Sequence, residues 1–555
     1  MITGAELFAD AARKLGLTTI FTLVGDHLND ALIACARLGL RIADLRHESS
    51  VTHAADAWAR THRRPALALV TGGPGHTNAL TGIATANLAS SPLIAVSGAP
   101  ATAMRRRVVF QDIDQVAMTA PIVKWAAEPP NAAQIPLYLS RASAEATAGR
   151  MGAVHLTIPI DLFGAQTEGP APFSLPAAPP APEPNQADVK RALALLRQAE
   201  RPVVIAGSGV WWADAGEELE KFLAKTRLPY YSLTMARGVI NDLHRCALGY
   251  GDPALNGGVR HAFPEADVVL VLGKRIDYRL ALGGPRLFSP AARFIQVDIH
   301  LQELGANRAL EVGICADVKA TLRAFNAALG RQRWKPLTWM RRVRRWHEEW
   351  MDSLFLQAER DARRRPMHPA ALYAALWREL PVSPLLAWDG GDFIHWGRAM
   401  IPATRAGGWL RLGPMGTIGA ALPNAIALQL AFPEERVVML TGDGALGFYI
   451  GELDTAVRHN LPIIVIVGND GAWGLEHELQ SALAGQTVAC ALRRTRYDLV
   501  MKGFGGDGET IDRPSEIAPA VKRAFSSKKP YLINAQIRGA RSPFTEWQLL
   551  GKKGA

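Results

Sequence analysis

Short, continuous runs of apolar residues recur along the chain and alternate with segments whose apolar residues are spaced as in helices. A strand that is apolar on both faces is buried on both faces, as in a parallel sheet covered by helices. The clearest runs are Ala66–Val70, Pro92–Gly98, Pro202–Gly209, Asp267–Gly273, Phe294–Asp298, Arg436–Gly444 and Pro462–Asp470. The pattern predicts an α/β fold of three doubly wound parallel-sheet domains.

Two segments of unusual composition are expected to join these domains. Gly169–Asn185 contains seven prolines, which favour an extended, semi-rigid linker. Arg331–Arg365 is rich in arginine, tryptophan and glutamate, and its apolar positions predict a basic helix followed by a short turn. The expected domains are therefore residues 1–168, 186–330 and 366–555.

Composition and cysteine usage narrow the class of protein. Hydrophobic residues make up 48% of the chain, enough for large cores, and no apolar stretch is long enough for a membrane span. The start carries Glu6 and Asp10 where a secretion signal needs an apolar core. The four cysteines lie far apart without a CxxC pair, which is typical of a reducing compartment. We expect a cytoplasmic protein with no membrane partner.

The formal net charge of +11 suggests an anionic partner. The basic runs Arg105–Arg107 and Arg341–Arg345 are not part of a recognisable nucleic-acid-reading fold, so we expect no nucleic-acid partner. An anionic cofactor or an acyl-CoA explains the charge better, and surface solubility alone is the other explanation.

The loop Thr441–Ala445 follows a predicted strand, at the kind of sheet edge where α/β domains bind ligands. Gly442 and Gly444 let backbone N–H groups approach an anion, and the following helix start adds partial positive charge. Asp443 would oppose an anion unless a divalent cation lay between them, which predicts a magnesium-bound phosphate. Taken alone, the loop is also explained by a helix that runs through residues 446–460 with Asp443 as its cap.

Two further strand ends carry oxygen-rich or small residues. Gly468–Gly471 follows the next strand, so adjacent parallel strands would bring Asp470 beside Asp443. Upstream, Gly390, Gly391 and Asp392 form a loop that can wrap the far end of a diphosphate.

These motifs resemble those of thiamine-diphosphate-dependent enzymes. The GDG triplet followed by Asn-Asp is similar to the family's signature, which usually ends in Asn-Asn. RHESSVTHAADAWAR (residues 46–60) resembles the segment with the catalytic glutamate, and TGGPGHTN (residues 71–78) resembles the glycine loop of the pyrimidine-binding domain. The similarity covers essentially the whole chain, in the order pyrimidine-binding, central and diphosphate-binding domain. It is strongest to the group of acetolactate synthases, benzaldehyde lyases and 2-hydroxyacyl-CoA lyases.

The resemblance implies roles for the cofactor and the metal. Glu48 would hydrogen-bond the aminopyrimidine of thiamine diphosphate, although beside Arg46 and His47 it could equally form a surface salt bridge. Mg²⁺ would be held by the side chains of Asp443 and Asp470 and by the carbonyl of Ala472. Gly442, Gly444 and Ala445, with Gly390, Gly391 and Asp392, would bind the diphosphate. Gly416 would offer its carbonyl to the 4′-amino group, and Ile418 would wedge between the two rings unless it is simply a core residue.

Two residues are implied to face the substrate. His27 falls where benzaldehyde lyase has its active-site histidine, and an imidazole suits proton transfer at a hydroxyl near neutral pH. Gln111 matches an active-site glutamine that hydrogen-bonds a carbonyl or hydroxyl. His76 and His395 lie in cofactor loops without an assigned role.

The implied reaction passes through an enamine and cleaves or forms a 2-hydroxy ketone or a 2-hydroxyacyl-CoA. The substrates would be an aldehyde, a 2-hydroxy ketone, a 2-oxo acid or an acyl-CoA. An acetolactate synthase is the main alternative, a simple 2-oxo acid decarboxylase is third, and an inactive regulatory or binding homologue is a hypothesis of another class.

The central domain has an ambiguous nucleotide pattern. Gly273–Arg275 and Val297–Asp298 suit phosphate and ribose contacts to FAD, ADP or CoA, but Trp212 breaks the dinucleotide fingerprint after Gly207. An empty domain fits equally well. Because Glu48 and the diphosphate loops belong to different domains, the resemblance implies an active site shared by two subunits in a homodimer or homotetramer.

Overall fold

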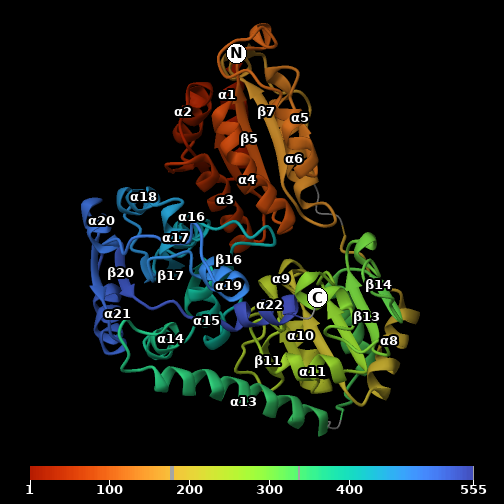
Figure 1. Cartoon of the computed structure of the whole chain (residues 1–555). Helices are drawn as coiled ribbons and strands as arrows, with labels where there is room; N and C mark the ends of the chain where they lie inside the picture. The colour runs from red at the N-terminus through yellow and green to blue at the C-terminus, as the bar shows by residue number, and fades with distance from the viewer. Residues whose placement is uncertain (176–179, 335–337, 554–555) are drawn as a thin grey trace.

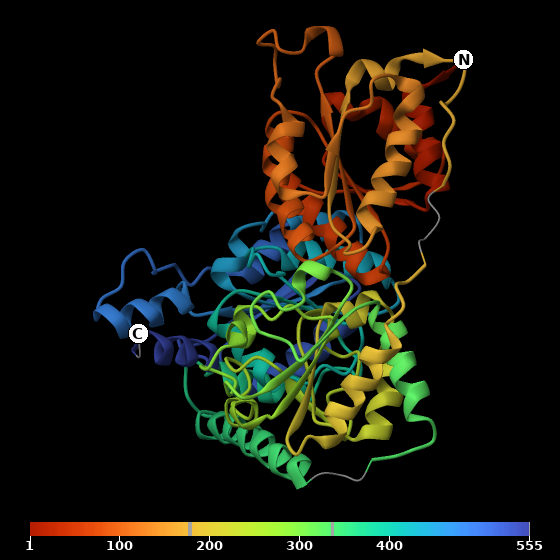
Figure 2. The same cartoon turned by 90° about the vertical axis from the view of Figure 1, so that its right-hand side faces the viewer.

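The computed structural model describes residues 1–175, 180–334 and 338–553 and contains three domains (Figure 1). Each domain has a six-stranded parallel sheet. Figures 1 and 2 show the first domain lying on top of the other two, which sit beside each other. The expected α/β architecture of three doubly wound domains is confirmed. Parts of both predicted joints, residues 176–179 and 335–337, lie outside the described residues.

The first sheet has the strand order β3-β2-β4-β5-β7-β6, and every residue of β4, β5 and β7 is buried. Its strands are β2 (Thr19–Thr22), β3 (Arg41–Asp44), β4 (Ala66–Val70), β5 (Leu93–Ala99), β6 (Trp125–Ala127) and β7 (Val154–Pro159), and the separate β1 (Ile2–Thr3) pairs with β8 (Gln166–Thr167). Its helices are α1 (Gly4–Lys14), α2 (Asn29–Arg37), α3 (Glu48–His62), α4 (Pro74–Leu88), α5 (Gln115–Thr119), α6 (Ile135–Thr147) and α7 (Ile160–Gly164).

The central sheet has the order β11-β10-β9-β12-β13-β14, with the apolar strands β9 and β12 in the middle. Its strands are β9 (Pro202–Ala206), β10 (Tyr230–Ser232), β11 (Ala247–Tyr250), β12 (Val268–Leu272), β13 (Arg293–Asp298) and β14 (Val312–Cys315). Its helices are α8 (Gln186–Gln198), α9 (Ser208–Trp212), α10 (Gly216–Thr226), α11 (Val259–Glu265) and α12 (Val318–Leu329).

The third sheet has the order β16-β15-β17-β18-β20-β19. Its strands are β15 (Leu385–Asp389), β16 (Trp409–Arg411), β17 (Val437–Gly442), β18 (Ile464–Asn469), β19 (Asp507–Ile511) and β20 (Tyr531–Gln536). Its helices are α14 (Pro369–Trp377), α15 (Asp392–Met400), α16 (Ala421–Ala431), α17 (Asp443–Gly447), α18 (Glu452–Arg458), α19 (Gly474–Ala484), α20 (Tyr497–Gly503), α21 (Ile517–Ser526) and α22 (Pro543–Lys553).

The segment after Asp443 differs from the single helix expected over residues 446–460. It forms two short helices, α17 and α18, which are separated by residues 448–451. Gly447 ends the first and Gly451 caps the second. Glycine is unfavourable inside a helix, so two glycines four residues apart explain the interruption.

Helix α13 (Thr338–Arg360) is the basic helix predicted in the second joint. It runs along the second and third domains on the side opposite the first domain (Figure 1). Its first half buries Trp339 and Val343 in a core of the central domain. Its second half buries Leu354 and Ala358 in a core of the third domain. The helix therefore holds these two domains together rather than serving only as a spacer. Across the described ranges, no helix is both long and apolar enough to span a bilayer.

The first and third domains pack directly on each other. Helix α3 lies against α16, and Val51 and Ala425 belong to one shared hydrophobic core. At the start of α3, the backbone N–H of Arg46 donates to the carboxylate of Glu452 on α18 (3.1 Å). The interface therefore anchors the helix that begins at Glu48.

Candidate active site

The three side chains predicted to be catalytic lie around one glycine-rich segment, residues 71–75, which runs from the end of β4 into the first turn of α4. His27 follows β2, and its Nδ1 lies 3.0 Å from Oγ1 of Thr71. Glu48 is the first residue of α3, and a Cβ placed on Gly75 would lie 3.4 Å from its Oε1. Gln111 packs its Cβ against Gly73. The three lie at the carboxyl edge of one sheet because parallel strands all end there.

The hydrogen bonds of His27 define its tautomer. The backbone N–H of Gly72 donates to Nδ1 (3.2 Å), so a neutral ring carries its proton on Nε2. Burial lowers the pKa of His27, although the charge of Asp26 raises it. The ring also fits closely against β5, because a Cβ on Gly98 would clash with the Cβ of His27. His27 is therefore a neutral imidazole held in one orientation.

Two amides hold this group together that the sequence analysis did not single out. Gln115 is buried, accepts the N–H of Gly73 at Oε1 (3.1 Å) and donates to the carbonyl of Gly98 (3.0 Å). Asn78 donates to Oε2 of Glu48 (3.0 Å). Neither contact has a sequence signal, because Gln111 and Gln115 do not share a helix and Asn78 lies 30 residues from Glu48.

His76, which had no predicted role, joins the turn to the domain core. Its Nδ1 lies 2.8 Å from Oγ of Ser97 on β5, and its Nε2 lies 3.0 Å from Oγ1 of Thr119 on α5. Thr119 in turn donates to the carbonyl of Gln115 (2.8 Å). Burial lowers the pKa of His76 to about 4, so the ring is neutral. A continuous polar chain therefore fixes α5 to α4.

Three adjacent strands of the third sheet bring a second group of loops together. Asp389 of β15 pairs with Thr441 of β17, and Gly442 pairs with Gly468 of β18. Just beyond these pairs lie the loops that begin at Gly390, Asp443 and Asp470. The register therefore places all three loops at one edge of the sheet.

The carboxylates of Asp443 and Asp470 lie close together at this edge. Asp443 accepts the N–H of Gly444 and of Gly471, both at 3.0 Å, and Asp470 accepts the N–H of Ala472 (3.2 Å). Burial and the neighbouring charge of Asp470 raise the pKa of Asp443 to about 7. A divalent cation would neutralise this repulsion, so the donor set fits Mg²⁺. Within the described ranges no group of three or more His, Cys, Asp and Glu side chains could hold a metal, which leaves carbonyl, phosphate and water oxygens as the other ligands.

Space for a ligand lies beside Gly442. A Cβ on Gly442 would meet no atom within 4 Å, and Gly390 adopts a φ of 105° close to the backbone nitrogen of Gly442. Ala445 begins the first turn of α17 beside them.

Asp392 is turned away from the other loops. Its carboxylate accepts hydrogen bonds from the hydroxyls of Ser542 and Thr545 at the start of α22, and burial raises its pKa to about 6. One turn later His395 stacks on Phe544, with ring centroids 4.1 Å apart. The contribution of this loop to a diphosphate would therefore come from its backbone.

Gly416 and Ile418 lie in the loop between β16 and α16. Gly416 is exposed with a φ of 73°, and Ile418 is half-buried. Between them, Thr417 Oγ1 lies 2.8 Å from Oγ1 of Thr85 on α4 of the first domain. The loop is thus held against the first domain of the same chain.

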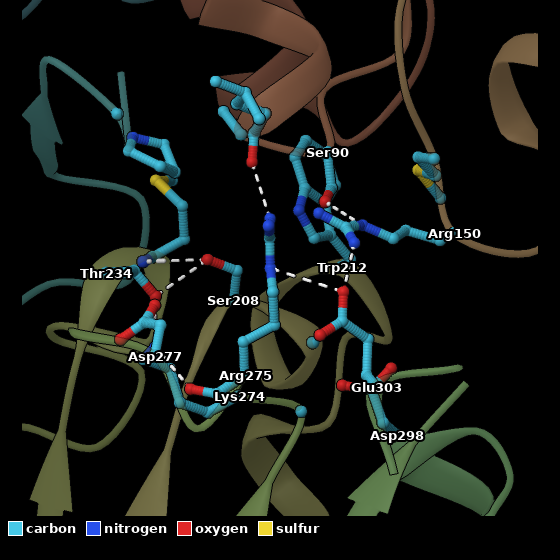
Figure 3. A pocket seen from close by; sticks show the side chains of 18 of the residues that line it. Ser90, Arg150, Ser208, Trp212, Thr234, Lys274, Arg275, Asp277, Asp298 and Glu303 are labelled. Atoms are coloured by element: carbon cyan, nitrogen blue, oxygen red, sulfur yellow. Dashed lines mark hydrogen bonds and ion pairs between the residues drawn. The ribbon is translucent and has the colours of Figure 1, made fainter. Parts of the chain in front are cut away.

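A cavity lies where the three domains meet, at the carboxyl ends of the central strands (Figure 3). Gly273–Arg275 and Asp298, which the sequence analysis singled out, line it. Lys274 pairs with Asp277 (2.5 Å), and burial lowers its pKa to about 8. Arg275 donates to the carbonyl of Leu88 (2.7 Å), joining the central domain to the first.

The fold and these loops define a class: an α/β enzyme of three parallel-sheet domains with ligand loops on the first and third. Three family descriptions match the chain in order: the N-terminal TPP binding domain of thiamine pyrophosphate enzymes over residues 2–118, the central domain over 189–325 and the C-terminal TPP binding domain over 389–535. The chain belongs to the thiamine pyrophosphate-dependent enzymes, in the group that contains acetolactate synthases and 2-hydroxyacyl-CoA lyases.

Several relatives match nearly the whole chain. Acetolactate synthase large subunit IlvG of Mycobacterium tuberculosis is 35% identical, over 95% of this chain and 94% of its own. The 2-hydroxyacyl-CoA lyase 2 of Danio rerio is 30% identical, over 96% and 91%. The human 2-hydroxyacyl-CoA lyase 1 is 28% identical, over 97% and 94%. Both activities are thus represented among relatives of similar coverage.

Proposed function

We propose that this enzyme is a thiamine-diphosphate-dependent C–C lyase and carboligase that cleaves or forms 2-hydroxy ketones or 2-hydroxyacyl-CoA. The observation that carries the proposal is the position of His27, a neutral imidazole held by Thr71 and Gly72 of the glycine-rich segment that also faces Glu48 and Gln111. A histidine in this state offers its Nε2–H as a hydrogen-bond donor to the oxygen of such a substrate.

Residues of the first domain would carry the proton transfers. Glu48, oriented by Asn78, would hold the proton at the aminopyrimidine of the cofactor. His27 would donate a hydrogen bond from its Nε2–H to the substrate oxygen and stabilise negative charge there, and Gln111 would hydrogen-bond the same oxygen. When bound, thiamine diphosphate supplies a nucleophilic carbon and an electron sink.

Residues of the third domain would hold the cofactor. Asp443 and Asp470, with the carbonyl of Ala472, would ligate Mg²⁺, which fits the mutual repulsion of the two buried carboxylates. Gly416 and Ile418 would hold the pyrimidine and the bend between the rings. The diphosphate would lie on the backbone of Gly390, Gly391, Asp392, Gly442, Gly444 and Ala445.

Acetolactate synthase activity is the second candidate. The relative of that name is 35% identical over 95% of this chain, compared with 30% for the lyase of Danio rerio. An inactive homologue is disfavoured because Glu48, Asp443 and a bulky Ile418 are all present.

An adenine nucleotide, as FAD, ADP or part of CoA, would occupy the cavity of the central domain. Support comes from Arg275 and Asp298, which line the cavity at strand ends. We further propose a cytoplasmic homodimer or homotetramer, because the family resemblance implies that Glu48 of one subunit meets the diphosphate loops of another.

The proposal is tested by comparing benzoin cleavage by the wild-type enzyme and His27→Asn, both with thiamine diphosphate and Mg²⁺. Loss of the imidazole Nε2–H that faces the substrate oxygen should lower kcat by about 100-fold or more while the Kd for the cofactor stays the same. Equal cleavage by the two proteins would contradict the role of His27.

A further inference from the structure

Three arginines surround the hydroxyl of Tyr250 where the central and third domains meet. Tyr250 ends β11, Arg398 lies on α15, Arg411 ends β16, and Arg279 follows β12 in the turn Tyr278–Gly283. The side chain of Arg398 is 1% exposed, and that of Tyr250 is 5% exposed. The cluster is therefore part of the interior.

Three donor atoms of this cluster are buried without an acceptor among the described residues. Arg398 donates one hydrogen bond, from Nη2 to the hydroxyl of Tyr250 (2.7 Å), while its Nε and Nη1 are buried without a partner. The Nε of Arg411 is likewise buried without a partner. Across the described ranges, no carboxylate forms an ion pair with Arg398 or Arg411.

The positive charge of the cluster exceeds the nearby negative charge. Arg279 pairs with Asp252 (3.0 Å), and Arg237, which stacks on the ring of Tyr250, pairs with Asp242 (2.5 Å). Asp389 also feels the charge of Arg411, but burial raises the pKa of Asp389 to about 7, so Arg398 and Arg411 have no paired counter-charge. Burial would raise the pKa of Tyr250, but the arginines outweigh it and lower the pKa to about 8, so at pH 7 the phenol stays largely protonated. Buried guanidinium groups without a counter-charge are costly, which points to a missing anion.

The cluster opens onto the cavity between the domains. Tyr250, Arg279 and Arg411 line this cavity together with Trp409 and Gly413. Other cations of the cavity already have partners: Lys274 pairs with Asp277, and Arg150 pairs with Glu303 (2.5 Å). Among the described cationic side chains that line the cavity, Arg411 is therefore the one with a buried donor that lacks a partner.

We propose that Arg411 and the hydroxyl of Tyr250 bind the phosphate or carboxylate group of a ligand in this cavity, with Arg398 and Arg279 supplying the surrounding positive charge. A guanidinium presents paired N–H donors that match such oxyanions. Neither Glu48 nor Asp443 lines this cavity, and the proposal does not depend on which reaction the enzyme catalyses.

The test uses the full chain saturated with thiamine diphosphate and Mg²⁺, so that the diphosphate loops are occupied. Calorimetric titration with inorganic phosphate should show binding to the wild type and at least about tenfold weaker binding to Arg411→Gln. Arg405→Gln is the matched control, because Arg405 pairs with Glu435 outside the cavity. The control should bind phosphate like the wild type.

Thermal unfolding separates this role from a structural one. Without phosphate, Arg411→Gln should melt no lower than the wild type, because it removes an uncompensated charge, and phosphate should raise Tm only in the wild type and the control. Should Arg411→Gln fail to fold, Tyr250→Phe serves instead and should also weaken phosphate binding.

Two further ligands identify the source of the anion. ADP binding more tightly than both phosphate and adenosine would show that the group belongs to a nucleotide, whereas equal binding of phosphate and ADP would indicate a free anion. The proposal is overturned if neither phosphate nor ADP binds the wild type, or if Arg411→Gln and the wild type bind them equally.

Discussion

The Nδ1 atom of His27 lies 3.0 Å from the hydroxyl of Thr71, the first residue after strand β4. This contact and the N–H of Gly72 both favour the neutral ring with its proton on Nε2. The protonation state of His27 is therefore set by its contacts with Thr71 and Gly72.

Replacing Thr71 with valine should disturb His27 without removing it. Thr71→Val deletes a donor that stabilises the neutral ring, so the pKa of His27 should rise and the acid limb of kcat should move to higher pH. We expect kcat to fall by about tenfold at pH 7. Thr77→Val, which changes an exposed threonine on α4, is the control. A pH profile identical to that of the wild type would show that Thr71 does not set the state of His27.

His76 should act as a positioning residue. His76→Phe removes the hydrogen bonds to Ser97 and Thr119 that fix α5, and with it Gln115, to the glycine turn. We expect KM for the substrate to rise severalfold while the Kd for thiamine diphosphate stays unchanged.

The same substitution should alter the pH dependence of stability. The folded-state pKa of His76 is about 4, below the ordinary value of 6.5, so the unfolded chain binds the extra proton between these pH values. Stability from this residue is therefore present above pH 6.5 and is lost as the pH falls towards 4. Tm measured from pH 7 to pH 5 should fall less steeply in His76→Phe. An equally steep fall would show that His76 is not buried and neutral.

Asp470 should strengthen the binding of Mg²⁺ and weaken the binding of the cofactor's anionic diphosphate. Asp470→Asn removes one negative charge beside Asp443, so Mg²⁺ should bind about tenfold more weakly and thiamine diphosphate more tightly. Asp352→Asn, an exposed position on α13, is the matched control. Titrations that find both affinities unchanged would rule out this effect of charge.

Arg275 should contribute to the binding of an acyl-CoA substrate and not to the binding of a small ketone. Arg275→Ala removes a cation from the cavity of the central domain, so KM for a 2-hydroxyacyl-CoA should rise by about tenfold while KM for benzoin stays the same. Arg323→Ala on α12, which does not line the cavity, controls for net charge. Equal effects on both substrates would show that Arg275 does not contact the nucleotide part of CoA.

Local patterns were sufficient to predict the fold. The run Ala66–Val70 is strand β4 to the residue, because a strand buried on both faces leaves an unambiguous apolar signature. The neighbouring positions of Asp443 and Asp470 also follow from the sequence, since adjacent parallel strands must end at one edge.

Contacts that depend on side-chain packing could not be predicted in this way. Gln115 and Asn78 were missed because an amide shows its partner only when strands and helices are in place. The carboxylate of Asp392 turns towards Ser542, which lies 150 residues away in the sequence. The break between α17 and α18 was missed because apolar periodicity outweighed the signal of Gly447 and Gly451.

The most direct test of the central proposal is a comparison of three substrates by the purified enzyme with thiamine diphosphate and Mg²⁺, with and without FAD. A C–C lyase should release aldehyde from benzoin or a 2-hydroxyacyl-CoA with a higher kcat/KM than it forms acetolactate from pyruvate, whether or not FAD is present. Rapid acetolactate formation from pyruvate with no aldehyde release from either hydroxy substrate would contradict the proposal and identify a synthase.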